Sequence, residues 1–579
     1  MAINPKEHYD VIIIGAGISG LTSSALFRKA GLSCCVVEMN PIPGGYLQGF
    51  NRKDFRFDSA IHWINNLGPN GLVTRIFEII GTDFPKVKEQ KRIRRFVSDY
   101  YDYLVTNNPD DFKAALIKDF PEDKKGIERF FKTARVLAKR LESHTYLSRT
   151  WDSMNFGERI QHMAKMIYFI IPFIPLVRFT GDEGVEKGLK KYFSNPNLRR
   201  IYSSESDLLS CLIPISWAYS NDFQTPPEGG SQTLPEWLEH VTNTLGGEIF
   251  YKTKVNKIII ENDTAVGIKA EHRGEEHIIK GKYIIAACDA ELLYTKLLPK
   301  SKLGDEWKVK LNKAEMYASA FTVALGLNCP AEELGLDEEN IYLYDPDLPR
   351  VKLGDGDPHT SGMHILASTV RDKSLSLPEH GTMTIFIPGF IEQFDYWKTE
   401  RDENGGYIRG EAYKKCKQEV ADILIDRVVA KLIPNLREHI VYTDIATPIT
   451  HQRYTGNKDG TMMGQRPGRF NSQGKMASYK TPYKNLIQSG HWADLGGGIP
   501  IAIKSSMNTT FMVLRQENKP VFRLLADYMS GKTEIDQVRA ANLLAHYEPS
   551  WELKPTPAQK IVIREKLKAE KAAKQATEK

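Results

Sequence analysis

Cysteine is scarce in this chain, and its spacing excludes two common uses of the residue. There are six cysteines in 579 residues, and no two of them form a C-x-x-C pair. Cys34 and Cys35 are adjacent on a predicted strand, so their side chains should point to opposite faces. We therefore predict neither a metal site nor a disulfide framework. Thiols of this kind are typical of a reducing compartment, and Met1 to Tyr9 lacks the apolar core of a signal peptide. Both features favour a cytoplasmic location.

Long apolar runs are also missing. The most apolar run, Met166 to Val177, has twelve residues and contains two prolines, whereas a membrane-spanning helix needs about 20 residues. Lys165 and Arg178 flank this run, as cations do at a membrane interface. The run is compatible with a buried core helix or with docking into one leaflet of a membrane.

No strong excess of one charge marks the chain as a whole. The net charge is +6, with 41% hydrophobic and 26% charged residues, which is typical of a folded protein without a nucleic-acid partner. Basic and apolar residues mix from Lys86 to Phe96, which favours a solvated strand or loop face over contact with anionic headgroups. The stretch Lys560 to Lys579 holds seven Lys or Arg against three Glu. It predicts a solvated helix or tail, and a bilayer tether is the alternative.

No nucleophile elbow, metal-ligand cluster or Walker loop stands out, so a bound cofactor should carry the chemistry. The beginning of the chain offers a site for one. Asp10 to Ile14 predicts a strand buried on both faces, and Leu21 to Lys29 has helical spacing. Between them lies a G-x-G-x-x-G turn, in which Gly15 makes the bend and Gly17 lets backbone approach a pyrophosphate. Gly20 lets the helix pack closely on the strand.

An acidic strand end completes this pattern. A second predicted strand, Cys34 to Val37, ends in Glu38, about 20 residues past the turn, where an acid binds a ribose hydroxyl. An acid there suits an adenosine with a free 2′-hydroxyl, such as FAD or NAD, over a 2′-phosphate. The context therefore predicts a dinucleotide site rather than a turn without a ligand.

A second glycine turn separates the two cofactors. Pro43-Gly44-Gly45-Tyr46 follows Glu38, and Phe55 to Trp63 comes next. These residues resemble the FAD-dependent amine-oxidase and phytoene-desaturase superfamily, in which this turn lies along the flavin. The Phe-Asp-x-x-Ile-His pattern ending at His62 is similar to the retinol saturase side of the branch that also holds carotenoid desaturases and isomerases. The resemblance implies an α/β flavoprotein of the type called a two-dinucleotide-binding-domain flavoprotein. Its expected parts are a discontinuous Rossmann-like FAD domain, a mixed-sheet substrate domain and a helical lid region.

The resemblance covers roughly residues 8 to 530 and implies further cofactor residues. Val255 matches a position that contacts the adenine end of FAD through its backbone. The closing section resembles the last flavin-contacting stretch of the family and implies contacts from Gly490, Gly497, Gly498 and Ile499. The family usually has Gly-Asp where this chain has Gly490-His491. Asp494, three residues further on, is a candidate to replace that carboxylate.

The same pattern divides the chain. We predict a FAD-binding domain over residues 8–70, 226–290 and 469–530, and a mainly helical lid or membrane-docking region over 71–225. Alternating runs, among them Ala318 to Leu327 and Thr382 to Ile387, predict a second sheet within a substrate-binding domain over 291–468. Residues 531–579 form a C-terminal extension with a linker at Pro549 to Pro557 and the basic tail.

The resemblance implies a FAD oxidoreductase that transfers hydride between flavin and a C=C or C–C bond of an apolar isoprenoid or polyene lipid. A retinol-saturase-like reductase is favoured, with carotenoid desaturation or cis–trans isomerisation as the alternative. A non-redox lipid carrier or escort protein is the alternative from another class. His62 is the candidate proton donor, because imidazole titrates near neutrality, and a buried histidine held by a carbonyl is its competing interpretation. Tyr454 and His491 are weaker candidates.

The implied partners are an apolar lipid, an unidentified electron donor or acceptor, and a membrane surface contacted peripherally. A lipid substrate favours membrane docking over a buried helix as the interpretation of Met166 to Val177.

Overall fold

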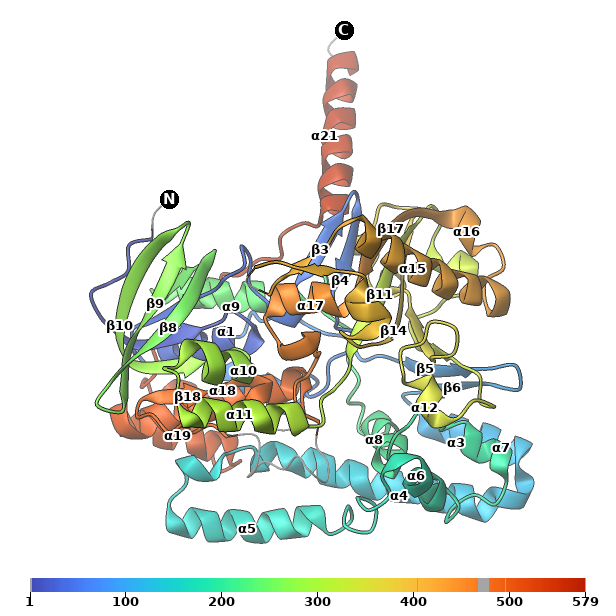
Figure 1. The fold of residues 1–579 in the computed structure, drawn as a ribbon, viewed down its shortest axis with the longest axis horizontal. Helices are drawn as coiled ribbons and strands as arrows, with labels where there is room; N and C mark the ends of the chain where they lie inside the picture. The colour runs from blue at the N-terminus through green and yellow to red at the C-terminus, as the bar shows by residue number, and fades with distance from the viewer. Residues whose placement is uncertain (1–2, 404, 467–477, 495, 578–579) are drawn as a thin grey trace.

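Apolar runs that lie far apart in the sequence pair into one seven-stranded sheet. The computed structural model describes residues 3–403, 405–466, 478–494 and 496–577, and the predicted boundary between 468 and 469 lies outside them. Figure 1 shows the sheet on the left. Its order is β7 (Glu248–Phe250), β2 (Cys34–Val37), β1 (Tyr9–Ile14), β10 (Glu275–Ala286), β9 (Thr264–His272) and β8 (Thr253–Glu261), with β18 (Leu486–Gln488) paired to β10.

Both faces of this sheet are covered, as the nearly all-apolar first strand requires. β1 pairs in parallel with β2 and β10, while β8, β9 and the first half of β10 form an antiparallel meander. Cys34 lies in the core on one face and Cys35 in the core on the other, which confirms their predicted alternation; all six thiols are free. The first face is covered by α1 (Ile18–Lys29), α9 (Thr233–Thr244) and α18 (Gly498–Glu517).

A second seven-stranded sheet forms the other half of the molecule. Its apolar core includes residues of α15 (Glu411–Lys431), which packs against it. The predicted runs Ala318 to Leu327 and Thr382 to Ile387 fall on two of its paired strands, so the mixed-sheet fold class is confirmed. The order is β17 (Ile440–Ala446), β11 (Ser319–Leu327), β14 (Gly381–Gly389), β13 (Met363–Leu366), β12 (Asn340–Leu343), β5 (Arg92–Val97) and β6 (Asp102–Thr106).

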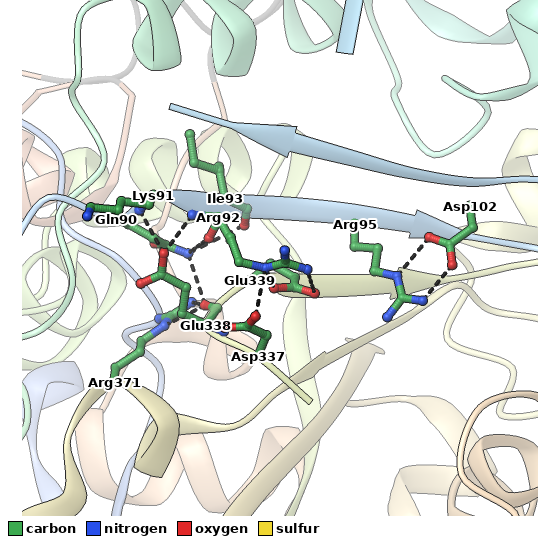
Figure 2. Close-up of polar contacts among 10 residues, drawn as sticks. All are labelled: Gln90, Lys91, Arg92, Ile93, Arg95, Asp102, Asp337, Glu338, Glu339 and Arg371. Atoms are coloured by element: carbon green, nitrogen blue, oxygen red, sulfur yellow. Dashed lines mark hydrogen bonds and ion pairs between the residues drawn. The ribbon is translucent and has the colours of Figure 1, made fainter. Parts of the chain in front are cut away.

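The last two strands come from the region that the sequence marks as mainly helical. β5 pairs in parallel with β12, and its arginines meet acidic partners rather than open solvent (Figure 2). Arg92 Nε lies 2.7 Å from Glu339 Oε2, and Arg95 Nε donates to Asp102 Oδ1 at 2.7 Å. Arg92, Arg94 and Arg95 are paired within the fold, so the interpretation as a solvated face fails for them. It holds for Lys86, Lys88 and Lys91, which are exposed.

Helices make up most of the remainder of 71–225 and pack around their own apolar core. The run Met166 to Val177 does not form a buried core helix, since α5 buries none of its residues. Phe173 and Leu176, just beyond its end, are buried. No described helix is both long enough and apolar enough to cross a membrane. The helices here are α2 (Leu72–Ile80), α3 (Pro109–Asp119), α4 (Lys124–His144), α5 (Phe156–Ile170), α6 (Gly181–Leu189), α7 (Pro196–Arg200) and α8 (Leu208–Tyr219).

The C-terminal extension is fastened to the body before it leaves it. Asp83 Oδ2 accepts hydrogen bonds from Tyr547 Oη at 2.7 Å and from the Trp551 backbone N–H at 2.9 Å. The predicted linker therefore begins as an anchored strap. It leads into α21 (Pro557–Thr577), which projects from the top edge in Figure 1, opposite α5 at the bottom. Between α18 and the strap lie α19 (Lys519–Met529) and α20 (Ile535–Ala540).

Candidate functional site

One large cavity runs between the two sheets and the helical region. Its volume is about 1340 Å³, and its lining is mostly apolar. Single-ligand pockets in proteins usually measure about 300–1,000 Å³, so this cavity has room for a dinucleotide and a second molecule. All the predicted site residues except Gly20 line it. They are Gly15, Gly17, Glu38, Gly44, Gly45, His62, Val255, Gly490, Gly497, Gly498 and Ile499.

The glycine turns form a cradle of bare backbone at one end of the cavity, which we call the cofactor end. Gly17 and Gly44 face each other in a parallel bridge, and Gly44 N–H donates to Ala16 O at 2.8 Å. A Cβ at Gly17 would meet nothing within 4 Å, whereas a Cβ at Gly20 would overlap the Gly15 carbonyl. Gly17 therefore opens onto the ligand space, and Gly20 serves the contact between α1 and β1.

Glu38 lies beside this cradle, at the end of β2. Its carboxylate oxygens accept the Ala16 N–H at 2.7 Å and the Asn40 N–H at 2.8 Å. Burial raises the pKa of Glu38, against the lowering effect of these hydrogen bonds. A carboxylate offers about four acceptor positions. The carboxylate also lines the cavity, where a ribose hydroxyl could donate to it.

Val255 and the closing glycines complete the cofactor end. Val255 lies on β8, and Gly497 caps the N-terminus of α18, whose first residues Gly498 and Ile499 also line the cavity. The free backbone N–H groups of a first helical turn carry a partial positive charge. That charge suits the electron-rich edge of a reduced flavin.

The departure from the family pattern at His491 has a structural consequence. His491 lines the cavity, and its Nε2 is buried without a hydrogen-bond partner among the described residues. Burial lowers the pKa of His491 to about 4, so the ring is neutral at pH 7. Asp494 does not replace the missing carboxylate, because it lies outside the cavity lining. It pairs with Lys504 Nζ at 2.7 Å and accepts Tyr479 Oη at 2.7 Å.

His62 lies further along the cavity, after β4 (Phe55–Asp58), which pairs with β3 (Gly49–Arg52). Its ring stacks on Phe386 with centroids 4.4 Å apart, and its backbone carbonyl accepts a hydrogen bond from Arg371. Burial, reinforced by Arg371, lowers the pKa of His62 to about 3. The expectation that His62 titrates near neutrality is therefore wrong. Tyr454 in α17 (Pro448–Thr455) lines the cavity with its ring 44% exposed.

Arg371 also ties this wall to the second sheet. Its Nε donates to Glu338 O at 2.7 Å, and the Glu338 carboxylate accepts the backbone N–H groups of Lys91 and Arg92 at 2.8 and 2.6 Å (Figure 2). β5, which the sequence places in the lid region, is thus linked through Glu338 to Arg371, the residue that also holds the His62 carbonyl.

Several residues of the opposite wall are not predicted from the sequence. Asp222 and Asn66 line the cavity together, as do His364 and Asn340 of the second sheet, whose side chains contact each other at 3.2 Å. Phe169 of α5 also reaches the lining. These side chains come from separate segments, so no spacing in the sequence links them. Asp222 precedes the Pro226 to Gly230 turn by four positions, which is a weak signal at best.

The open glycine cradle, the Glu38 carboxylate in the cavity lining and the buried His491 Nε2 without a partner among the described residues all fit a flavin dinucleotide. A second, apolar compartment continues past His62 and Phe386. The geometry therefore suits a flavin at one end and an apolar molecule next to it.

Comparisons with known proteins agree with this geometry. Residues 13–80 match the family model described as an NAD(P)-binding Rossmann-like domain. The chain is 25% identical over 473 residues to prolycopene isomerase 2 of an Oncidium hybrid cultivar, which covers 79% of this chain and 76% of the relative. It is 23% identical over 534 residues to all-trans-retinol 13,14-reductase of Danio rerio, covering 85% and 83%. An inactive all-trans-retinol 13,14-reductase of the same species is 24% identical over 509 residues, covering 84% and 82%.

Solved structures share the fold. Putrescine oxidase bound to putrescine superposes with a TM-score of 0.55 at 13% identity, covering 88% of this chain and 99% of the other. An oxidoreductase from Methanosarcina mazei gives a TM-score of 0.52 at 17% identity, covering 86% and 98%. These structures show that the chain has the fold of putrescine oxidase. Prolycopene isomerases and all-trans-retinol 13,14-reductases are its homologues at 25% and 23% identity, which confirms the resemblance seen in the sequence and agrees with the expected flavin-dependent oxidoreductase.

Proposed function

We propose that this protein is a FAD-dependent reductase that saturates a C=C bond of an apolar isoprenoid or polyene lipid. The observation that carries the proposal is the continuity of one cavity. It has a glycine cradle for a dinucleotide at one end and a wall of aromatic side chains, including Phe386 and Trp217, next to it. Two relatives are named for retinol reduction and for an isomerase of the polyene prolycopene.

The bound flavin would supply the hydride, and the chain would place the substrate against it. Gly17 and Gly44 would hold the pyrophosphate, and Glu38 the ribose. Phe386 and Trp217 would keep the chain of the lipid in an environment without water, where apolar surface is stabilised by about 25 cal/mol per Å². The electron donor that reduces the flavin is not identified.

We further propose that α5 docks into one leaflet of a membrane and delivers the lipid. Ile167 of α5 is 55% exposed, and Ile171 and Ile174, which follow the end of α5, are 54% and 58% exposed. This is a large apolar surface to leave in water. Phe169 of the same helix lines the cavity. An apolar lipid could then pass from the leaflet to the flavin without crossing water. This interpretation supports a peripheral membrane protein.

The alternatives to a reductase are another flavin-dependent activity and a carrier without redox activity, and experiments can distinguish them. A desaturase or a cis–trans isomerase would use the same cavity, and the prolycopene isomerase relatives favour the second. A non-redox carrier would keep the lipid compartment without turnover, and one relative is named as inactive.

The test is a single anaerobic experiment on the purified full chain loaded with FAD. The flavin is reduced with dithionite and mixed with all-trans-retinol or prolycopene in liposomes. A reductase reoxidises the flavin and yields a product two hydrogens heavier. An isomerase leaves the mass unchanged. In a parallel arm that starts from oxidised FAD, a desaturase bleaches the flavin. A protein that stays colourless with FAD but retains polyene is a carrier, and that result would sink the proposal.

A further inference from the structure

Asp222 is an acidic side chain in the lining of the cavity. The segment that carries it runs antiparallel to the segment after His62. Ile64 N–H donates to Gln224 O at 2.8 Å, and Gln224 N–H donates back to Ile64 O at 3.0 Å. This pairing sets Asp222 opposite Asn66, and both side chains line the cavity.

Asn66 holds the Asp222 carboxyl group in one orientation. Its backbone N–H donates to Asp222 Oδ1 at 2.5 Å, and its side-chain Nδ2 donates to Oδ2 at 3.1 Å. Asn66 has a φ of +61°, a left-handed conformation that asparagine adopts more readily than most residues. The turn thus directs two hydrogen-bond donors of Asn66 at the Asp222 carboxyl group. These two bonds fix the orientation of the carboxyl group.

No described cation neutralises Asp222. The charged group that acts on it is Glu142 of α4, which also lines the cavity and has the same sign. Arg94 of β5 lies in the lining but is paired with Glu205 at 3.1 Å. His62, on the adjacent segment, is neutral at pH 7. Burial and Glu142 raise the pKa of Asp222 to about 7, so a proton is available there near neutral pH.

The other titratable groups of the lining are poorly suited to proton donation. Glu38 belongs to the cofactor end, and His491 has a pKa of about 4. Burial, with Arg94 and His62, lowers the pKa of His364 well below its usual range. A general acid works best when its pKa lies near the working pH.

We propose that Asp222 is the proton donor of the reduction, with Asn66 as the residue that positions it. The proposal rests on the function proposed above. A bound reduced flavin would supply the hydride with loss of its N–H bond, so that a C–H bond would form on one alkene carbon. The electron pair of the C=C bond then takes a proton from the Asp222 carboxyl group at the other carbon. The product gains two hydrogens, the flavin is oxidised, and the carboxylate recovers its proton from water.

The test measures single-turnover reoxidation of reduced flavin by the polyene that the wild type accepts, between pH 5 and pH 9. The wild-type rate should fall as pH rises through about 7, because the acid loses its proton. Asp222→Asn should slow reoxidation about a hundredfold or more and remove the pH step, while Asp222→Glu should keep it. Glu142→Gln should move the step to lower pH, since it removes the anion that raises the pKa.

Asp289→Asn is the matched control. Asp289 also has a raised pKa, about 6 because of burial, but it caps α10 (Ala290–Leu292) and lies outside the cavity lining. Its variant should keep the wild-type pH step per bound flavin. A rate for Asp222→Asn within threefold of wild type, with the step retained, would overturn the proposal.

A second measurement separates this proposal from the proposed function. Infrared difference spectra of the FAD-loaded wild type against Asp222→Asn should show one protonated carboxyl band that disappears as pH rises through about 7. This readout needs no turnover. Absence of substrate reduction with the band present would reject the reductase function, whereas absence of the band would reject Asp222 as the acid.

Discussion

The two ends of the cavity are built by different means. The cofactor end consists of backbone: Gly17, Gly44 and Gly497 stand where side chains would fill the ligand space or strain the chain. The opposite wall consists of side chains, such as Asp222, His364 and Phe386, brought together from separate segments. A backbone site needs particular residues at fixed spacing, while a side-chain wall needs only a shape. The first can therefore hold one cofactor while the second varies with the substrate.

The largest effect is expected from placing a side chain in the cofactor end of the cavity. Gly17→Leu should abolish flavin binding, because the side chain enters the space meant for a pyrophosphate. The melting temperature of the flavin-free protein should hardly change, since nothing lies within 4 Å of the new Cβ. Visible absorbance and thermal melting check both parts. Gly20→Leu is the contrasting variant: it should fail to fold, because its side chain would overlap backbone. Yellow, flavin-bound Gly17→Leu would contradict the cradle.

The next largest effect is expected where α5 extends the apolar wall to the surface. Ile167→Asp with Ile171→Asp should weaken liposome binding at least a hundredfold, because each removes a side chain worth about 1.5–3 kcal/mol on burial. Flavin content and melting temperature should stay near wild type. Phe173→Asp should instead unfold the region, since Phe173 is buried. Liposome flotation gives the binding, and unchanged flotation of the double variant would refute docking.

A smaller effect, on FAD affinity, should distinguish His491 from Asp494. His491→Ala should weaken FAD binding about tenfold, since one hydrogen bond is worth about 1 kcal/mol. Asp494→Asn should leave FAD affinity unchanged and lower thermal stability, because Asp494 holds Lys504 and Tyr479. Fluorescence titration with FAD measures both. The reverse pattern would return the cofactor role to Asp494.

The smallest effect is on the unfolding free energy and concerns β5, whose Arg94 lies in the cavity lining. Arg95→Ala removes a partly exposed ion pair with Asp102 and should cost less than about 1 kcal/mol of unfolding free energy. Arg371→Met should cost more, about 1–3 kcal/mol, because it leaves the His62 carbonyl without its donor and leaves the Glu338 carbonyl with Gln90 Nε2 alone. Urea denaturation compares the two, and equal losses would remove Arg371 from its positioning role.

The same contrast explains what the sequence can predict. The glycine turns, Glu38 and the second sheet are predictable, because backbone conformation and alternation leave a periodic trace. Asp222 is not, since its role depends on the antiparallel pairing that brings Asn66 to it. His62 is predictable as a cavity residue but not as a neutral one, because burial decides its pKa. Likewise β5 resembles a charged surface until its acidic partners, distant in sequence, are known.

The pairing of β18 with β10 has a consequence for synthesis of the chain. β10 ends at Ala286 and β18 begins at Leu486, 200 positions later. At about 5–20 residues per second, roughly 10 to 40 s pass on the ribosome between these strands. Until then the apolar edge of β10 lacks its partner, and the cavity lacks Gly490 to Ile499. The nascent chain must keep this edge from pairing with other proteins, so its dependence on chaperones should be greatest after β10 is made and before β18 is made.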